Sequence, residues 1–174
     1  MNRIKLILPI PEYKEKLMEY KREFIKNGDS MDGTAGLNNA DTFEDWYSAI
    51  CDNSKEATVR EGLVPATTYM AVLINDDSLV GMIDIRHRLN DYLFNFGGHI
   101  GYSIRKSERR KGYATEMLRL ALIECKKLNM EKVLITCDKD NIGSSKTIIN
   151  NNGILENEIP EENRITQRYW VTLD

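Results

Sequence analysis

The stretch that decides the fold is HIGYSIRKSERRKGYATEMLRLALIECKKL, residues 99–128. Its first part alternates apolar residues at 100, 102 and 104 with polar or small residues at 99, 101 and 103, as a strand with two unlike faces does. Its last part places apolar residues at 114, 117, 118, 121, 122, 125 and 128, the spacing of an amphipathic helix. We therefore predict a strand, a basic loop at 107–115 and a helix that packs one face on a sheet.

The segments on either side predict the rest of this sheet. Residues 132–137 read as a buried β-branched strand, so the strand, helix, strand order from 99 to 137 predicts a parallel neighbour reached by a right-handed crossover. Residues 68–74 and 79–85 predict a hairpin. Further strands are expected at 4–8, 154–159 and 165–173. Further helices are expected at 12–26, after Asp41 or Thr42, and near 144–150, with loops at 27–41 and 86–98. These elements predict an α/β (α+β) fold.

Length and composition limit the kind of protein. A chain of 174 residues with 41% hydrophobic residues fits a single domain over 1–174. A net charge of -3 gives no basic field, so we expect no nucleic acid or membrane partner. The three cysteines form no CxxC pair, and no apolar run reaches the roughly 18 residues of a membrane span. We expect a soluble, cytoplasmic protein without a metal.

The basic loop has the features of a phosphate site. A helix N-terminus offers unpaired N–H groups and a positive dipole end, and Gly112 and Ala114 leave the approach open. Arg109, Arg110 and Lys111 add charge suited to two linked phosphates. The alternative is a solvated surface turn before an ordinary helix. The loop matches neither the nucleoside-triphosphate motif GxxxxGK[ST] nor the dinucleotide motif GxGxxG.

The pattern Arg109-x-x-Gly112-x-Ala114 resembles the [Gln/Arg]-x-x-Gly-x-[Gly/Ala] signature of the GNAT superfamily of N-acetyltransferases. The order of elements over residues 68–160 is similar to the core of that superfamily, in its bacterial small-molecule or peptide branch. The resemblance implies a mixed, mostly antiparallel twisted sheet with a V-shaped splay between two parallel strands. The N-terminal helices are compatible in kind but carry no motif of their own.

The resemblance also implies acetyl-CoA as cosubstrate and assigns it a site. The backbone of Tyr102 would lie at the thioester carbonyl and that of Ile104 at the pantetheine arm. Asn141 and Ser144 would lie across the gap, near the thiol. The residues implied around the pyrophosphate are Arg109, Arg110, Lys111, Gly112, Tyr113, Ala114 and Thr115.

Transfer to an amine needs a base, and here the sequence departs from the family pattern. Gly98 stands where many relatives have a glutamate. The adjacent His99 is a candidate base, acting directly or through water, or else a histidine hydrogen-bonded at the end of the sheet. Asp84 is a second candidate base, or else a carboxylate on the polar face of the hairpin.

The sequence also leaves open which group protonates the departing thiolate. Ile148 stands where many relatives have a tyrosine, so the Ser144 hydroxyl or a water molecule is the candidate. Ser144 would also serve as the N-cap of its helix. Cys137 ends a buried apolar strand, which argues against a covalent acyl-enzyme and for direct transfer, with the Tyr102 N–H polarising the carbonyl.

We expect an acyltransferase that acetylates a primary amine of a small molecule or peptide, as a monomer or homodimer. The acceptor would be bound by the N-terminal helices and the loops 27–41 and 86–98. The missing glutamate and tyrosine leave a non-catalytic acyl-CoA-binding module as the alternative. A protein-interaction domain without a ligand is a third hypothesis, based on the aromatic residues at 92–96.

Overall fold

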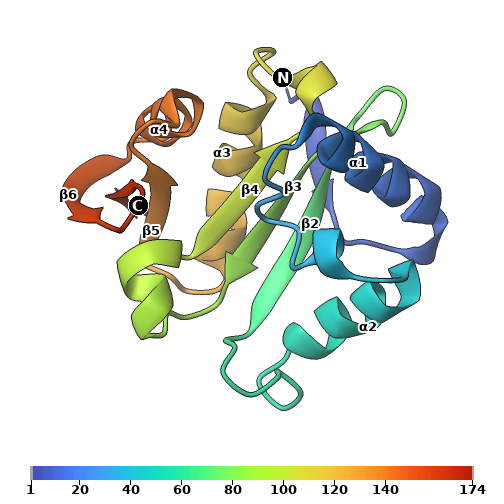
Figure 1. Ribbon diagram of the computed structural model, residues 1–174, viewed down its shortest axis with the longest axis horizontal. Helices are drawn as coiled ribbons and strands as arrows, with labels where there is room; N and C mark the ends of the chain where they lie inside the picture. The colour runs from blue at the N-terminus through green and yellow to red at the C-terminus, as the bar shows by residue number, and fades with distance from the viewer. Residues whose placement is uncertain (1, 174) are drawn as a thin grey trace.

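Seven strands form one sheet in the computed structural model, which describes residues 2–173. Their order across the sheet is β1-β2-β3-β4-β5-β7-β6 (Figure 1). The strands are β1 (Ile4–Ile7), β2 (Ala66–Leu73), β3 (Leu79–Arg86), β4 (Ile100–Ile104), β5 (Lys132–Asp138), β6 (Ile154–Pro160) and β7 (Ile165–Thr172).

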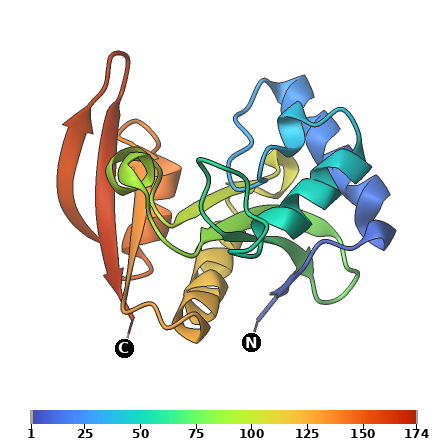
Figure 2. The ribbon, with the colours of Figure 1, turned by 90° about the horizontal axis from the view of Figure 1, so that it is seen from below.

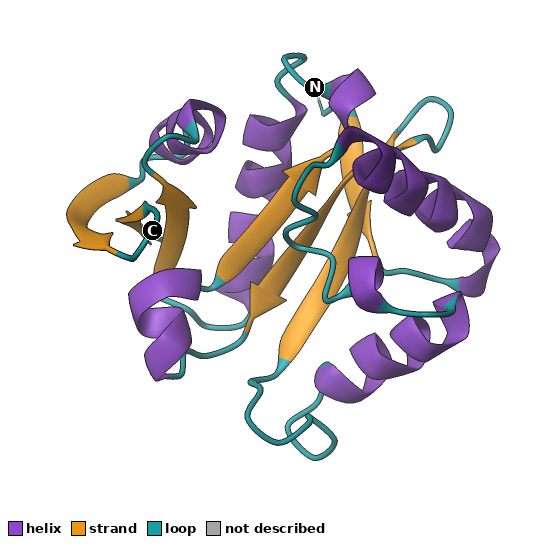
Figure 3. Ribbon diagram, in the orientation of Figure 1, coloured by secondary structure: helices purple, strands orange, loops and turns teal. Residues whose placement is uncertain are grey.

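The pairing of β4 with β5 differs from every other pairing in the sheet. All other neighbours are antiparallel, whereas β4 and β5 are parallel and share one register pair, Ile100 with Ile135. Beyond this pair the two strands separate (Figure 3). The mixed, mostly antiparallel sheet with a splay between two parallel strands is thus confirmed.

Four α-helices cover the two faces of the sheet. Figure 2 shows α1 (Lys14–Asn27) and α2 (Phe43–Asn53) on one face and α3 (Tyr113–Lys127) on the other. The helix α4 (Ile142–Ile149) contacts α3. Two apolar clusters result, one centred on α3 and one between α1, α2 and the first strands. Within residues 2–173, no helix combines the length and apolar character that a membrane crossing needs.

The helix boundaries follow from local capping. Of the two helix starts that the sequence left open, the structure has the one after Thr42, whose hydroxyl accepts the Asp45 N–H at 3.1 Å and caps α2. Gly28 ends α1 in the left-handed conformation, with φ of 65°. Short 3-10 segments also occur: η1 (Pro11–Tyr13), η2 (Leu37–Asn39) and η4 (Lys106–Glu108).

Two elements differ from the sequence prediction. The expected loop 86–98 contains a one-turn π-helix, η3 (Leu93–Gly97), which is too short for any periodicity to reveal. The last helix begins at Ile142 rather than near Ser144, because the Asn141 side chain accepts the Ser144 N–H at 3.0 Å and is itself the N-cap. The N-cap role expected for Ser144 is therefore wrong.

Candidate active site

A cavity of about 760 Å³ lies where β4 and β5 separate. Its walls come from segments far apart in the chain: the loop after α1, η3, β4, the loop before α3, the end of β5 and the start of α4. Ten of the twelve site residues predicted from the sequence line it: Tyr102, Ile104, Arg109, Arg110, Gly112, Tyr113, Ala114, Thr115, Asn141 and Ser144. The two that do not line it are His99 and Lys111.

One edge of β4 faces this cavity. At the two ends of β4, the Arg105 N–H donates to β3 at 3.0 Å and the His99 carbonyl accepts from β3 at 2.8 Å. Because hydrogen-bonded residues alternate along an antiparallel strand, the backbone groups of Tyr102 and Ile104 point away from β3, toward the splay. The strand therefore directs the backbone groups of Tyr102 and Ile104 toward the cavity.

The N-terminus of α3 forms the far end of the cavity. Gly112 is its N-cap, with φ of 84°, and no side chain caps the helix. The next three residues, 113–115, line the cavity with Arg110, which has a φ of 62°. This end therefore combines uncapped N–H groups, a helix dipole and one cation, as an anion site requires.

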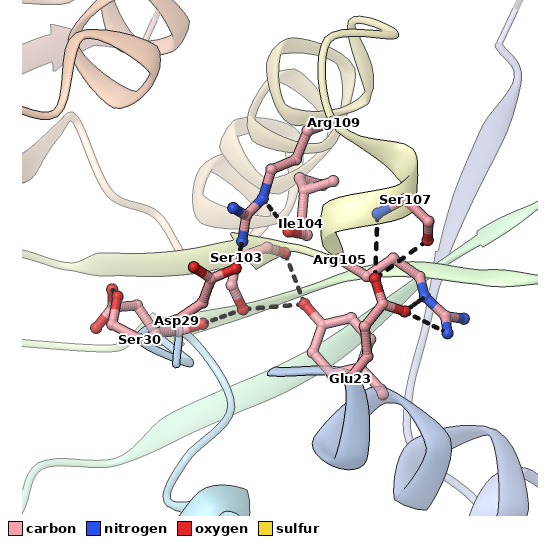
Figure 4. A network of polar contacts seen from close by, with 10 residues as sticks. Glu23, Asp29, Ser30, Ser103, Ile104, Arg105, Ser107 and Arg109 are labelled. Atoms are coloured by element: carbon pink, nitrogen blue, oxygen red, sulfur yellow. Dashed lines mark hydrogen bonds and ion pairs between the residues drawn. The ribbon is translucent and has the colours of Figure 1, made fainter. Parts of the chain in front are cut away.

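Arg109 is less available for an anion than its sequence position predicts. Its guanidinium donates to the Ile104 carbonyl at 2.9 Å and pairs with Asp29 at 2.8 Å (Figure 4). The Arg109 contact with the cofactor stays a prediction, and Asp29 offsets part of the charge that Arg109 would bring to it. The Ile104 carbonyl is occupied as well, so that Ile104 offers the cavity its N–H alone.

Lys111 is directed away from the cavity. Its ammonium pairs with Glu108 at 2.9 Å, and its carbonyl accepts from the Arg3 guanidinium at 2.8 Å. Lys111 does not line the cavity and its ammonium is held by Glu108, so its contact with the pyrophosphate stays a prediction. Arg3 also lies over the Tyr113 ring, so the N-terminal segment supports this loop from outside.

A polar network ties the end of β4 to α1 (Figure 4). The Glu23 carboxylate pairs with Arg105 at 2.6 Å and accepts the Ser107 N–H at 3.1 Å. The buried Tyr20 hydroxyl lies 3.0 Å from both the carbonyl and the hydroxyl of Ser103. These contacts hold the strand end and the loop before α3 in place without using the backbone edge that faces the cavity.

Two hydroxyl groups meet across the splay. The Tyr102 phenol reaches from β4 to α4, where its oxygen lies 2.7 Å from the Ser144 hydroxyl. Burial raises the pKa of Tyr102, so the phenol keeps its proton at neutral pH. Sequence analysis assigned a role to the Tyr102 backbone and missed this side chain, because no local pattern reveals a contact with α4.

His99 occupies the second of its two expected roles. The ring Nδ1 of His99 accepts the Leu134 backbone N–H at 2.9 Å, and the backbone N–H of His99 donates to the Leu134 carbonyl at 2.7 Å. Burial, together with the nearby Arg86 charge, lowers the pKa of His99 to about 4. With its acceptor nitrogen already used and its ring off the cavity wall, the geometry favours a structural histidine over a base.

The low pKa of His99 predicts a pH-dependent stability. The folded state holds His99 neutral, whereas the unfolded chain binds a proton below a pKa of about 6.5, so stability is lost as pH falls from about 6.5 through 4. The loss is on the order of 3 kcal/mol. Urea unfolding at pH 7 and pH 4 measures it. The variant His99→Asn keeps an acceptor for the Leu134 N–H, so its free energy of unfolding should fall less between pH 7 and pH 4 than that of wild type. An equal fall in the two proteins would show that His99 is not the source of the pH dependence.

Family membership rests on a sequence match. The chain matches the family described as "Acetyltransferase (GNAT) domain" over residues 12–153, well over half its length. The chain belongs to the GNAT acetyltransferase family. None of the curated proteins matches it.

Solved GNAT acetyltransferases share the fold at low sequence identity. RimL, a ribosomal L7/L12 α-N-protein acetyltransferase in complex with CoA, is 12% identical with a TM-score of 0.73, covering 100% of this chain and 96% of that one. The microcin C7 self-immunity acetyltransferase MccE, in complex with acetyl-CoA and AMP, is 18% identical with a TM-score of 0.65. That match covers 99% of this chain and 94% of MccE. A chimera of spermidine N-acetyltransferase SpeG from Vibrio cholerae is 13% identical with a TM-score of 0.67. That match covers 98% of this chain and 96% of the chimera.

The structure explains why this GNAT chain departs from the family pattern at two positions. Gly98 has a φ of 66°, and a Cβ there would lie 2.7 Å from the Leu134 carbonyl oxygen, so a glutamate does not fit. Ile148 is fully buried in the cluster around α3. Neither position offers an ionisable group to the cavity.

The remaining sequence candidates are also held elsewhere. Asp84 is buried between the Thr68 hydroxyl at 2.8 Å and Arg86 at 3.2 Å, and it does not line the cavity. Cys137 does line it, but burial raises the pKa of the thiol to about 11, so the thiol is protonated at neutral pH. Across residues 2–173, no three His, Cys, Asp or Glu side chains gather as a metal site.

Proposed function

We propose that the chain transfers the acetyl group of acetyl-CoA directly to a primary amine of a small molecule or peptide. The observation that carries this proposal is the free edge of β4, where backbone groups of Tyr102 and Ile104 face a cavity that continues to the uncapped N-terminus of α3. An open strand edge favours a ligand with amide groups, and an uncapped helix start favours phosphate. The pantetheine arm and pyrophosphate of CoA offer both.

Different groups of the chain bind different parts of acetyl-CoA, which supplies the acetyl group as an activated thioester. The backbone of Gly112 to Thr115 and the Arg110 side chain bind the pyrophosphate, while the Ile104 N–H pairs with the pantetheine arm. The Tyr102 N–H donates to the thioester oxygen, on which negative charge grows during attack. Asn141 and Ser144 lie at the thiol end.

The hydroxyl pair prepares Ser144 to act on the thiolate. A phenol is a stronger donor than an aliphatic alcohol, so Tyr102 donates to Ser144 across their 2.7 Å contact. The Ser144 hydroxyl, which also hydrogen-bonds with the Cys137 thiol, can then donate its hydrogen to the departing sulfur. A thiolate with a pKa of about 8.5 needs only modest help at neutral pH.

The acceptor amine loses its proton to solvent in this proposal. An alkyl amine has a pKa of about 10.4, so its neutral fraction falls about tenfold for each unit by which the pH lies below that value. His99 and Asp84 lie off the cavity wall and Cys137 holds its proton, which favours attack by the free amine over base-assisted or covalent routes. RimL and SpeG are named for a protein and a polyamine acceptor, and both classes fit this chemistry.

Amine-dependent release of CoA is the expected result when the protein, acetyl-CoA and a panel of primary amines are mixed. At subsaturating amine, the rate should rise between pH 7 and pH 9 with the neutral fraction of the amine. A thiol reagent added after quenching measures the CoA released. Thermal stabilisation by acetyl-CoA, without release across the panel, would instead support the acyl-CoA-binding module and overturn the proposal.

A further inference from the structure

The short helix η3 lies at the opposite end of β4 from the pyrophosphate loop. Gly98 and His99 connect η3 to the start of β4, whereas the loop before α3 follows the end of β4 at Ile104. Figures 1 and 2 show η3 and the loop that follows α1 on the same face of the sheet, opposite α3. A thioester placed at Tyr102 therefore has η3 on the side away from the pyrophosphate loop.

The cavity side of η3 is aromatic. Tyr92 and Phe96 line the cavity with Leu93, and their ring centroids lie 5.8 Å apart. Tyr92 is 62% exposed, so its ring is accessible to a ligand in the cavity. Phe94 differs, since it lies under the Arg168 guanidinium, 4.8 Å from its ring centroid, and does not line the cavity.

Side chains from three strands hold the backbone of η3. The Arg168 guanidinium donates to the Phe94 carbonyl at 3.0 Å, and the Thr136 hydroxyl donates to the Phe96 carbonyl at 2.7 Å. Arg86 donates to the Gly97 carbonyl at 3.2 Å. Arg168 is only 3% exposed. These anchors make the aromatic wall preorganised, which lowers the entropic cost of binding a ligand against it.

The wall opposite η3 is polar and acidic. Asp32, from the loop after α1, lines the cavity and accepts from the Ser30 hydroxyl at 2.9 Å. Among residues 2–173, Asp32 forms no ion pair, whereas Arg86 is paired with Asp84 and Arg164 with Glu161. Two cations that line the cavity, Arg110 before α3 and Lys146 on α4, also form no ion pair in the described chain. Asp32 is thus the free anion that the loop after α1 offers to an incoming ammonium group.

We propose that the acceptor is a primary amine that carries an aromatic or bulky apolar group, which packs on Tyr92 and Phe96 while the amine enters past Asp32. This inference rests on the proposed function and names its substrate class. A small polar amine would leave the aromatic wall uncovered and would bind more weakly.

The test compares 2-phenylethylamine with ethanolamine. For wild type, kcat/KM for CoA release should be about 30-fold higher with 2-phenylethylamine. Tyr92→Ala should bring this ratio to within about threefold. Phe94→Leu is the matched control, because it changes an aromatic residue of the same helix that does not line the cavity. It should keep the wild-type ratio.

A second readout does not depend on turnover. Calorimetry of the CoA-bound protein should show tighter binding of 2-phenylethylamine than of ethanolamine, and Tyr92→Ala should abolish that difference. Equal binding of the two amines to wild type, or an unchanged ratio in Tyr92→Ala, overturns the inference. Turnover without amine preference would leave the proposed function intact, whereas absence of turnover with every amine would overturn the proposed function and leave the binding result to decide the inference.

Discussion

Replacing Gly112 with valine is expected to lower the affinity for CoA by about 100-fold. Gly112 has a φ of 84°, a conformation that costs an L-residue roughly 1–2 kcal/mol and a β-branched one more. The strain would displace the N–H groups that follow at the start of α3. Losing one or two hydrogen bonds to a charged phosphate costs about 3 kcal/mol, which is about 100-fold in Kd. Calorimetric titration with CoA measures the change.

Gly28 provides a matched control for the strain itself. It has a φ of 65° at the end of α1, a Cβ there would meet no atom within 4 Å, and it does not line the cavity. Gly28→Val should therefore lower the unfolding free energy to a similar degree and leave the Kd for CoA unchanged. Normal CoA binding by a folded Gly112→Val protein would place the pyrophosphate elsewhere.

Ser144→Ala is expected to lower kcat by about 30-fold with little change in KM for acetyl-CoA. The variant removes the hydroxyl that we propose donates to the departing sulfur, a contribution smaller than the 100-fold or more of full proton transfer. Tyr102→Phe should lower kcat by about tenfold, because it removes the phenol that orients Ser144 and keeps the backbone N–H. Steady-state kinetics with a saturating amine measures both.

The double variant distinguishes positioning from a general structural effect. If Tyr102 acts through Ser144, adding Tyr102→Phe to Ser144→Ala should lower kcat no further. Tyr69→Phe is the control, since Tyr69 is a partly buried tyrosine on β2 that does not line the cavity. Additive losses in kcat, or a rise in KM for acetyl-CoA that accounts for them, would argue against the hydroxyl pair.

Much of the fold follows from local sequence. The alternation over 100–104 and the helical spacing over 114–128 predict β4 and α3, and the structure has them at 100–104 and 113–127. The family resemblance of the same stretch implies that the helix start at Gly112 lies at a cofactor held in the splay. Ten of twelve site residues line the cavity for this reason, because position along a strand or at a helix end determines where a backbone points.

The side-chain partners could not be predicted in this way. Asp29 lies eighty positions from Arg109, and nothing in the basic loop indicates that an acid after α1 will neutralise that charge. His99 looked available for catalysis until β5 placed the Leu134 N–H against its ring. The helix η3 could not be predicted, because its five residues contain no repeat. Side chains of Arg86, Thr136 and Arg168 hold it by donating to its backbone carbonyls.

The sequence by itself determined the elements, their order and the helix start that faces the splay, since each depends on residues within about one helical turn or strand of one another. Only the tertiary structure decided which polar side chains remain free in the cavity. Hydrogen bonds and ion pairs form wherever distant segments meet, so Arg109 and His99 were taken up by Asp29 and Leu134, and Tyr102 gained a partner in Ser144.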